Sequence, residues 1–347
     1  NIAWTPDEKN VLIARLNRAQ NKMELEEYNG ATGAKVKTHF KETDSRYVEP
    51  ENPALYQNGE EGCYYWQSER DGFNHIYLYK NGKLKKQITK GNWMVTGIVG
   101  QDKDLPYLTK EVKELYFTAT KKSALETHYY HVDAVNETTS SITKESGNHY
   151  CIPNEDFTLW IDVFSSMDVP NRTQIIDVDG EIKKILHNAK NPLADYKLGN
   201  TRIFKIKANG TEFYSRMITP PNFDSTKKYP VITYVYGGPH AQMITNRYLG
   251  GSNYWMQMMA QKGYIVFTMD NRGSKNRGFE FESVIHAKVG DAELEDQLAG
   301  VQYLKSLPFV DTTRMGVHGW SFGGFMTTSL MTRHPEAYQV GVAGGPV

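Results

Sequence analysis

The chain has 347 residues, of which 39% are hydrophobic and 23% charged, with 40 Lys and Arg against 40 Asp and Glu. A net charge of zero argues against nucleic acid or an anionic membrane surface as the main partner. No apolar run approaches the ~20 residues that would span a bilayer, and the length favours two domains.

Residues 1–190 alternate short apolar runs with polar turns, which predicts β-strands in consecutive pairs. Turn signals such as Asn81-Gly82 and Asp179-Gly180 close several of these pairs. The inner strands begin near Val11, Tyr64, Leu115 and Leu159, at a spacing close to the repeat of a four-stranded propeller blade. The predicted pairs are 10–16 with 23–28, 62–67 with 74–79, 114–119 with 128–135, and 158–164 with 173–178.

These pairs predict three or so C-terminal blades of a β-propeller. So few blades do not close a ring, and we expect further sequence upstream. An ordinary β-sandwich is the alternative. Cys63 and Cys151 are expected to be free buried thiols, although a disulfide between them stays open.

Residues 191–347 change to strands alternating with helices, which predicts a parallel α/β sheet. Asp291 is expected to cap a helix with Leu294, Leu298, Val301 and Leu304 on one face. The predicted strands are 204–207, 212–218, 230–236, 264–269, 315–317 and 338–343, and further helices are predicted at 255–262 and 322–334.

Ser321 lies in Gly319-Trp320-Ser321-Phe322-Gly323, between a short apolar strand and a helix. A serine between two glycines at such a turn is the nucleophile elbow of the α/β-hydrolases. The turn is too tight for side chains at the flanking positions, and it places the hydroxyl at a helix N-terminus that favours developing negative charge. Ser321 is therefore the predicted nucleophile.

A serine nucleophile needs a histidine base oriented by a carboxylate, and in this fold both follow the serine. After Ser321 the chain holds one histidine, His334, and one acid, Glu336. A helix of about 12 residues carries both roughly 18 Å away from the serine. His318 is expected to be a strand residue. We expect the triad Asp and His to lie beyond Val347 and the 347 residues alone to be inactive.

The predicted oxyanion hole has two donors, the N–H of Phe322 and a group from the loop after the third strand of the sheet. That loop is Tyr236-Gly237-Gly238-Pro239-His240, where Tyr236 carries a hydroxyl. A packed aromatic with an incidental hydroxyl is the alternative for Tyr236, and His240 is expected to be a loop residue and not a catalyst.

Several motifs agree in order and spacing with one family: Tyr236-Gly237-Gly238-Pro239, Asp270-Asn271-Arg272-Gly273-Ser274, Glu295-Asp296-Gln297 and the serine turn. Together they resemble the prolyl oligopeptidase clan. The Trp before the serine and Ser68-Glu69-Arg70-Asp71-Gly72 resemble its dipeptidyl peptidase IV branch, and the last five residues resemble bacterial dipeptidyl and prolyl tripeptidyl peptidases. The resemblance covers nearly the whole chain, as the last propeller blades (1–190) and the first part of an α/β-hydrolase domain (191–347).

The resemblance implies that Ser321 forms the acyl-enzyme and that Tyr236 and Phe322 hold the oxyanion. It also implies that the Phe322 ring borders the pocket for the substrate's proline, where tyrosine is usual. The 270–274 and 295–297 motifs are interpreted as turn and capping structure. The acidic pair that binds the substrate N-terminus in the family has no match here. Glu26-Glu27 and Glu60-Glu61 are interpreted as solvated turn or strand-edge charge.

The serine turn together with the resemblance implies a serine exopeptidase that releases N-terminal di- or tripeptides after proline, with no cofactor and no metal. Its partners are peptides with proline near the N-terminus, neither nucleic acid nor membrane, and a homodimer stays open. An acylaminoacyl peptidase or esterase on the same fold is one alternative, and a catalytically inactive propeller binding protein is another. Bacterial members of the family are usually exported, so the resemblance implies a periplasmic or secreted location.

Overall fold

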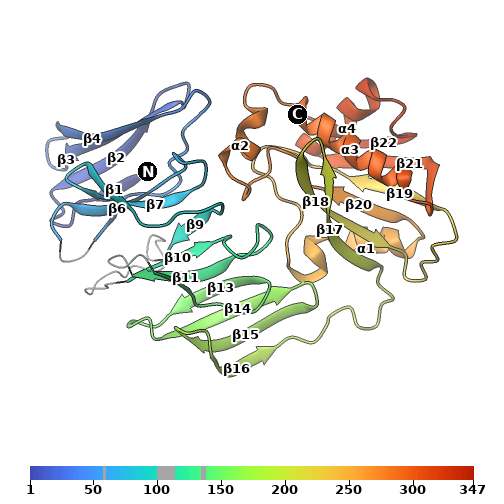
Figure 1. The fold of residues 1–347 in the computed structure, drawn as a ribbon, viewed down its shortest axis with the longest axis horizontal. Coiled ribbons are helices and arrows are strands. Elements are labelled where there is room, and N and C mark those ends of the chain that lie inside the picture. Colours follow the sequence, from blue (N-terminus) through green and yellow to red (C-terminus); the bar gives the residue numbers. More distant parts are fainter. Residues whose placement is uncertain (58–59, 100–113, 134–137) are drawn as a thin grey trace.

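The computed structural model describes residues 1–57, 60–99, 114–133 and 138–347, as four separate four-stranded sheets followed by one six-stranded sheet with helices. The four sheets follow one another along an arc, and the six-stranded sheet lies beside that arc (Figure 1). Each of the four is an antiparallel meander in chain order, as expected of propeller blades. Blades are therefore present as predicted, but the described residues form four of them where three or so were expected.

The first two blades are joined by a shared aromatic core. Tyr64, Trp66, Tyr77 and Tyr79 are all buried there, beside aliphatic side chains of the first blade. Asn81 and Gly82, both with positive φ, close the β7–β8 hairpin as their sequence predicts. The strands of these blades are β1 (Ile2–Trp4), β2 (Asn10–Leu16), β3 (Lys22–Asn29), β4 (Lys35–Thr43), β5 (Leu55–Tyr56), β6 (Cys63–Ser68), β7 (His75–Lys80) and β8 (Lys83–Gln87).

The third and fourth blades include the strand pairs β10–β11 and β14–β15, close to the predicted ranges. The predicted strand 128–135 is described to Asp133, and residues 134–135 lie outside the described part of the chain. The strands are β9 (Val95–Ile98), β10 (Glu114–Ala119), β11 (His128–Asp133), β12 (Thr139–Ser141), β13 (Asn148–Pro153), β14 (Leu159–Ser166), β15 (Val169–Asp177) and β16 (Ile182–Asn188).

The prediction for the two cysteines of the blades is confirmed, whereas that for an acidic pair is wrong. Cys63 and Cys151 are free and buried, as expected. The interpretation of Glu26 and Glu27 as solvated charge is wrong, because both are buried in β3. The Glu26 carboxylate is neutralised locally by Lys35 and Arg15, and the hydrogen bond from Lys35 lowers its pKa.

The six-stranded sheet has the order β17-β18-β20-β19-β21-β22 and is mixed, although a parallel sheet was expected. β17 and β18 form an antiparallel hairpin through Asn209-Gly210, and β18 also pairs antiparallel with β20. The pairs β19–β20, β19–β21 and β21–β22 are parallel. The strands are β17 (Asn200–Ala208), β18 (Thr211–Thr219), β19 (Tyr229–Tyr234), β20 (Ile265–Met269), β21 (Val310–Trp320) and β22 (Val340–Gly344). β16 ends at Asn188, so residues 189–199 connect the last blade to this sheet.

The helical elements of this part are α1 (Tyr254–Gln261), α2 (Phe279–Glu282), α3 (Ala292–Ser306) and α4 (Phe322–Arg333), with short 3₁₀ turns η1 (Tyr248–Gly251) and η2 (Ser283–Ile285). Leu294, Val301 and Leu304 of α3 are buried against the sheet, as their spacing predicts. Asp291 stands at the N-cap of α3, but its side chain makes no capping hydrogen bond and pairs with Arg333. The predicted position of Asp291 is therefore correct, but the predicted capping hydrogen bond is absent.

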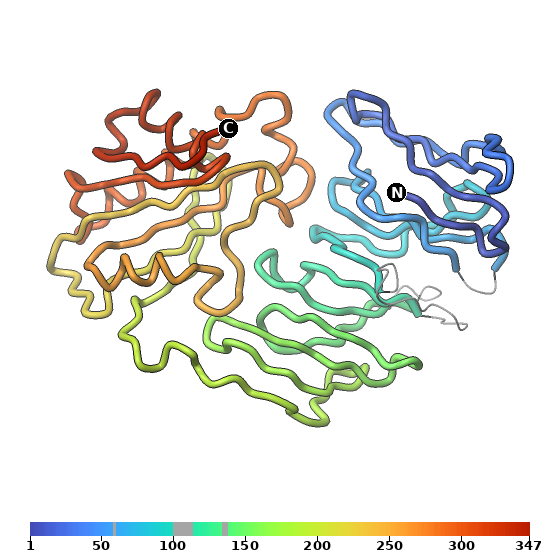
Figure 2. Tube along the Cα trace, turned by 180° about the vertical axis from the view of Figure 1, so that it is seen from behind, coloured from blue at the N-terminus to red at the C-terminus, as the bar shows by residue number. Residues whose placement is uncertain are grey.

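The carboxyl ends of the parallel strands β19, β20 and β21 meet at one edge of the sheet. Loops from that edge contact the blades at both ends of the arc (Figures 1 and 2). At one end, Arg46 forms two hydrogen bonds with Glu280 of α2, 3.0 and 2.6 Å long. At the other, Asn246 of the loop after β19 bonds to the third and fourth blades.

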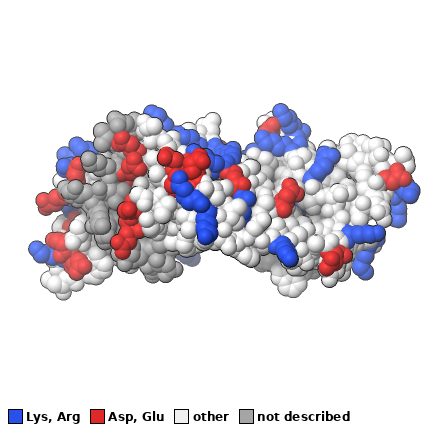
Figure 3. All heavy atoms as spheres, turned by 90° about the horizontal axis from the view of Figure 1, so that it is seen from below, with Lys and Arg blue, Asp and Glu red and all other residues white. Residues whose placement is uncertain are grey.

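The surface carries no large single-sign field on the face that Figure 3 displays. Basic and acidic side chains are interspersed there, in keeping with equal numbers of the two. Within the described residues, none of the helices combines the length and the apolar character that crossing a membrane requires.

Candidate active site

Ser321 occupies a sharp reversal between β21 and α4. Its φ of 56° and ψ of −121° lie in a region that non-glycine residues rarely adopt. Hydrogen bonds fix this conformation: the Ser321 N–H donates to the Gly344 carbonyl at 2.9 Å, and its carbonyl accepts from Gly324 N–H at 2.8 Å. The predicted turn is thus present, with a strained serine at its apex.

The glycines around the serine are required by the packing of the backbone. A Cβ at Gly319 would lie 2.4 Å from the carbonyl oxygens of Gly323 and Val235. A Cβ at Gly323 would lie 2.3 Å from the same Val235 oxygen. Real Cβ atoms do not approach so closely, so both flanking positions admit only glycine, the reason inferred from the sequence.

The Ser321 side chain is partly exposed and has no hydrogen-bond partner among the described residues. A serine at the N-cap of a helix normally accepts from an N–H of the first turn, but here no such bond forms. The φ and ψ of the elbow account for this, since they differ from the extended conformation that a capping residue adopts. The hydroxyl is therefore left available at the helix N-terminus.

The predicted oxyanion groups lie next to this turn. Phe322 is the first residue of α4, where an N–H has no partner within the helix and the helix dipole favours negative charge. The rings of Tyr236 and Phe322 are 6.4 Å apart, centroid to centroid. The structure thus brings the three predicted site residues, Ser321, Phe322 and Tyr236, to one edge of the sheet.

A hydrogen-bonded brace supports the Tyr236 loop, and the sequence interpretation missed it. The Asn271 amide donates to the Gly237 carbonyl at 3.2 Å and accepts from Gln297 at 2.9 Å. The Asp270 carboxylate accepts from the N–H groups of Met243 and Ile244 at 2.8 and 3.1 Å.

An ion pair between partly exposed Arg272 and buried Asp296 adjoins these hydrogen bonds. Arg272 Nη2 lies 2.7 Å from an oxygen of Asp296, whose side chain is buried. The motifs at 270–274 and 295–297 therefore do more than form turns and caps. The position of Asp270 and Asn271 could have indicated this role in the sequence. Both directly follow β20, and the carboxyl ends of the parallel strands lie at the edge of the sheet that carries Ser321.

The histidines near the elbow in sequence are engaged elsewhere. His318 Nδ1 hydrogen-bonds the Val342 carbonyl at 2.9 Å, and its ring packs edge-on against Trp255. His334 lies at the far end of α4, 3.5 Å from Glu336. Neither contacts Ser321, in agreement with the expectation that neither serves as its base.

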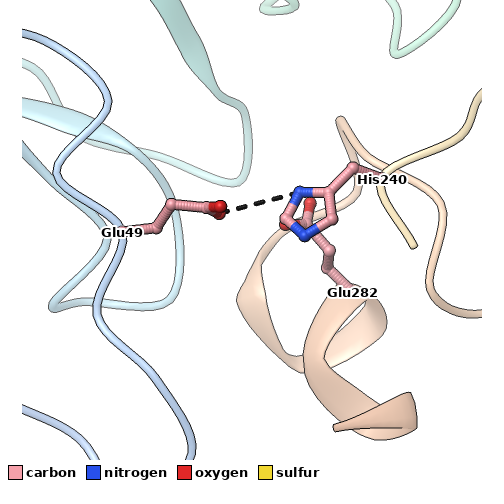
Figure 4. A group of neighbouring side chains, drawn as sticks. All are labelled: Glu49, His240 and Glu282. Atoms are coloured by element: carbon pink, nitrogen blue, oxygen red, sulfur yellow. Dashed lines mark ion pairs between the residues drawn. The ribbon is translucent and has the colours of Figure 1, made fainter. Parts of the chain in front are cut away.

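His240 lies where the Tyr236 loop meets the propeller (Figure 4). Its Nδ1 is 3.1 Å from Glu282 of the hydrolase part and 3.6 Å from Glu49 of the propeller. The ligand atoms of the three residues lie within 4.8 Å of one another, a spacing that a cation would also suit. Because His240 already pairs with both carboxylates, we assign the group to the domain junction.

Several carboxylates crowd this junction and perturb one another. Burial, then the charges of Glu69, Glu49 and Glu51, raise the pKa of Glu282 to about 8. Burial and the charges of Glu51 and Glu49 likewise raise the pKa of Glu69 to about 7. Burial and mutual repulsion at the junction therefore favour the protonated, neutral form of both acids.

Comparison with known proteins agrees with this architecture. Residues 1–171 match the model of the dipeptidyl peptidase IV N-terminal region, and residues 252–347 match that of the prolyl oligopeptidase family. Human dipeptidyl peptidase 8 is 30% identical over 315 residues, which are 80% of this chain and 34% of that protein.

Two solved bacterial structures are similar over the whole chain. A Bacteroides ovatus protein assigned as a dipeptidyl aminopeptidase IV is 39% identical with a TM-score of 0.92, and the match covers 51% of it. Dipeptidyl peptidase 4 of Porphyromonas gingivalis is 27% identical with a TM-score of 0.88, over 48% of its length. The chain thus spans about half the length of these relatives. It belongs to the prolyl oligopeptidase family, in the dipeptidyl peptidase IV branch, as a propeller fragment followed by the first part of an α/β-hydrolase domain.

Proposed function

We propose that the full-length protein is a serine exopeptidase that releases N-terminal dipeptides after proline through an acyl-enzyme. The observation that carries the proposal is the strained Ser321 turn, with an unbonded hydroxyl at a helix N-terminus. The relatives named dipeptidyl peptidases support the substrate class.

In the proposed reaction, Ser321 Oγ attacks the carbonyl carbon of the proline residue while the hydroxyl proton passes to a base. The carbonyl oxygen becomes an oxyanion that accepts from Phe322 N–H and Tyr236 OH. Collapse then breaks the C–N bond, the base returns the proton to the leaving amine, and the dipeptidyl group stays on Ser321 as an ester. Water, activated by the same base, hydrolyses this ester and releases the dipeptide.

The base would be a histidine oriented by an aspartate outside these 347 residues, because His318 and His334 have other partners. The 347-residue chain alone is therefore proposed to be inactive. The Phe322 side chain, which packs edge-on against Phe325 at 5.1 Å, would border the proline pocket.

The test uses the full-length protein with a fluorophosphonate probe and a Gly-Pro anilide. We expect wild type to be labelled and active, and Ser321→Ala to be neither while keeping its melting temperature. Ser329→Ala is the matched control, since Ser329 lies on the same helix and should leave both readouts unchanged. An unlabelled wild type would leave the propeller binding protein as the better hypothesis.

A substrate panel separates the enzymatic alternatives. Faster cleavage of Ala-Ala-Pro anilide than of Gly-Pro anilide would indicate tripeptide release. Faster hydrolysis of acyl esters or acylamino acid anilides would indicate the esterase or acylaminoacyl peptidase. A periplasmic or secreted location and a homodimer stay part of the proposal, and cell fractionation and light scattering test them.

A further inference from the structure

Asn246 connects the hydrolase part to the seam between the third and fourth blades. Its backbone N–H donates to the Leu125 carbonyl at 2.9 Å, and its carbonyl accepts from Asn148 Nδ2 at 3.0 Å. Its side chain donates to Glu126 Oε1 at 2.7 Å and to Ser146 Oγ at 3.1 Å.

The remaining group, Asn246 Oδ1, accepts from the Met167 N–H at 3.2 Å. Every donor and both acceptor oxygens of the residue thus bond to the propeller. The amide has one workable orientation, because a flip would turn its oxygen toward the Glu126 carboxylate and its NH₂ toward a backbone N–H.

The receiving side on the propeller is buried and already hydrogen-bonded. Glu126 is 6% exposed, and its second oxygen lies 2.8 Å from His128 Nε2. Burial alone would raise the pKa of Glu126, but bonds from His128, Ser146 and Asn246 hold it at about 2. The Asn246 amide therefore donates to a fixed, charged acceptor, which is the stronger kind of hydrogen bond.

On the hydrolase side, the same loop is held at two points by adjacent residues. Asp270 accepts hydrogen bonds from the N–H groups of Met243 and Ile244, three and two residues before Asn246. Asn271 binds the carbonyl of Gly237, the residue after Tyr236. A displacement of the loop at Asn246 is therefore transmitted through Asp270 and Asn271 to the backbone that carries Tyr236.

We propose that Asn246 is a positioning residue that sets the Tyr236 hydroxyl for the oxyanion by fixing its loop to the propeller. This inference rests on the proposed function. A loop shifted by a fraction of an ångström would weaken a bond made mainly in the transition state, so turnover should fall more than substrate binding.

The test is a double-mutant cycle in the full-length enzyme with Gly-Pro anilide. We expect Asn246→Ala to lower kcat about tenfold or more and to change KM less than threefold. In a Tyr236→Phe background, the same change should lower kcat less than threefold, because the group it positions is gone. Asn222→Ala, at an exposed asparagine of the same domain, is the matched control and should leave both constants unchanged.

Losses of kcat that multiply in the double variant would overturn the inference, as would an effect on KM or melting temperature alone. Should Asn246→Ala not fold, Ser146→Ala removes one acceptor of the same amide, and the same cycle should show a non-additive loss of about threefold. A wild type that neither hydrolyses the anilide nor reacts with fluorophosphonate overturns the proposed function as well. An active wild type with multiplying losses overturns the Asn246 inference alone.

Discussion

The rings of Tyr236 and Phe322 face a glycine, Gly238, that leaves room for both. A Cβ at position 238 would lie 2.8 Å from Tyr236 Cε1 and 3.1 Å from Phe322 Cγ. The Tyr236 ring, which carries the proposed oxyanion donor, and the Phe322 ring of the proposed proline pocket can therefore lie this close together only because position 238 has no side chain.

Gly238→Ala is therefore expected to move one or both rings and to lower kcat by roughly 10- to 100-fold. The protein should still fold, since the aromatic side chains can give way. The measurement is steady-state kinetics on Gly-Pro anilide. Gly97→Ala, where the nearest atom would be 3.4 Å from the new Cβ, is the control. Unchanged kinetics in Gly238→Ala would show that the rings are not held at this spacing for catalysis.

Tyr236→Phe removes only the hydroxyl and is expected to lower kcat by roughly 10²- to 10³-fold with a smaller change in KM, as for other oxyanion donors. Tyr234→Phe, at the end of β19, is a matched control because the Tyr234 ring packs against His318 and a buried apolar cluster and has no role in the proposed reaction. Stopped-flow and steady-state assays give the two constants. Near wild-type turnover would remove Tyr236 from the mechanism.

Phe322→Ala should raise KM for Xaa-Pro anilides by roughly 10-fold or more, because the apolar contact with the proline ring is lost. Phe322→Tyr should keep that contact. The internal control is an Xaa-Ala anilide, which lacks the proline ring and should lose much less. Equal losses for both substrates would place the Phe322 side chain outside the proline pocket.

The acids of the domain junction predict a stability that falls as the pH rises. The folded pKa of Glu282, about 8, lies above its ordinary value of 4.5. The folded protein therefore binds more protons than the unfolded chain in this range, and the contribution is complete below about pH 4.5 and lost as the pH rises through 8.

Glu282→Gln removes that titration. The fall in melting temperature between pH 5 and pH 8.5 should be smaller than in wild type by roughly 2–4 °C, the shift that about 1 kcal/mol makes in a domain of this size. Glu280→Gln is the control, because Arg46 lowers the pKa of Glu280 and its linkage lies at more acidic pH. If the melting temperatures of Glu282→Gln and wild type changed with pH in parallel, the raised pKa of Glu282 would be refuted.

The residues that could be predicted are those whose role depends on their immediate neighbours in sequence. Asn81-Gly82 closes a hairpin because its own backbone needs positive φ. Gly319 and Gly323 flank Ser321 because the turn between them is tight. The short apolar runs predicted the two inner strands of each blade but not the two outer ones. Such local rules were sufficient for the fold class and for gathering Ser321, Phe322 and Tyr236 as a candidate site.

The sequence could not decide contacts between residues that lie far apart along the chain. Asn246 and Glu126 are separated by 120 positions, and His240 meets Glu49 only because the hydrolase loops fold back onto the first blades. Glu26 and Glu27 were misjudged for the same reason, since burial depends on what packs above a strand. A chain's own sequence thus determines where its backbone bends, whereas the burial and pairing of its charges depend on which distant segments the tertiary structure brings against them.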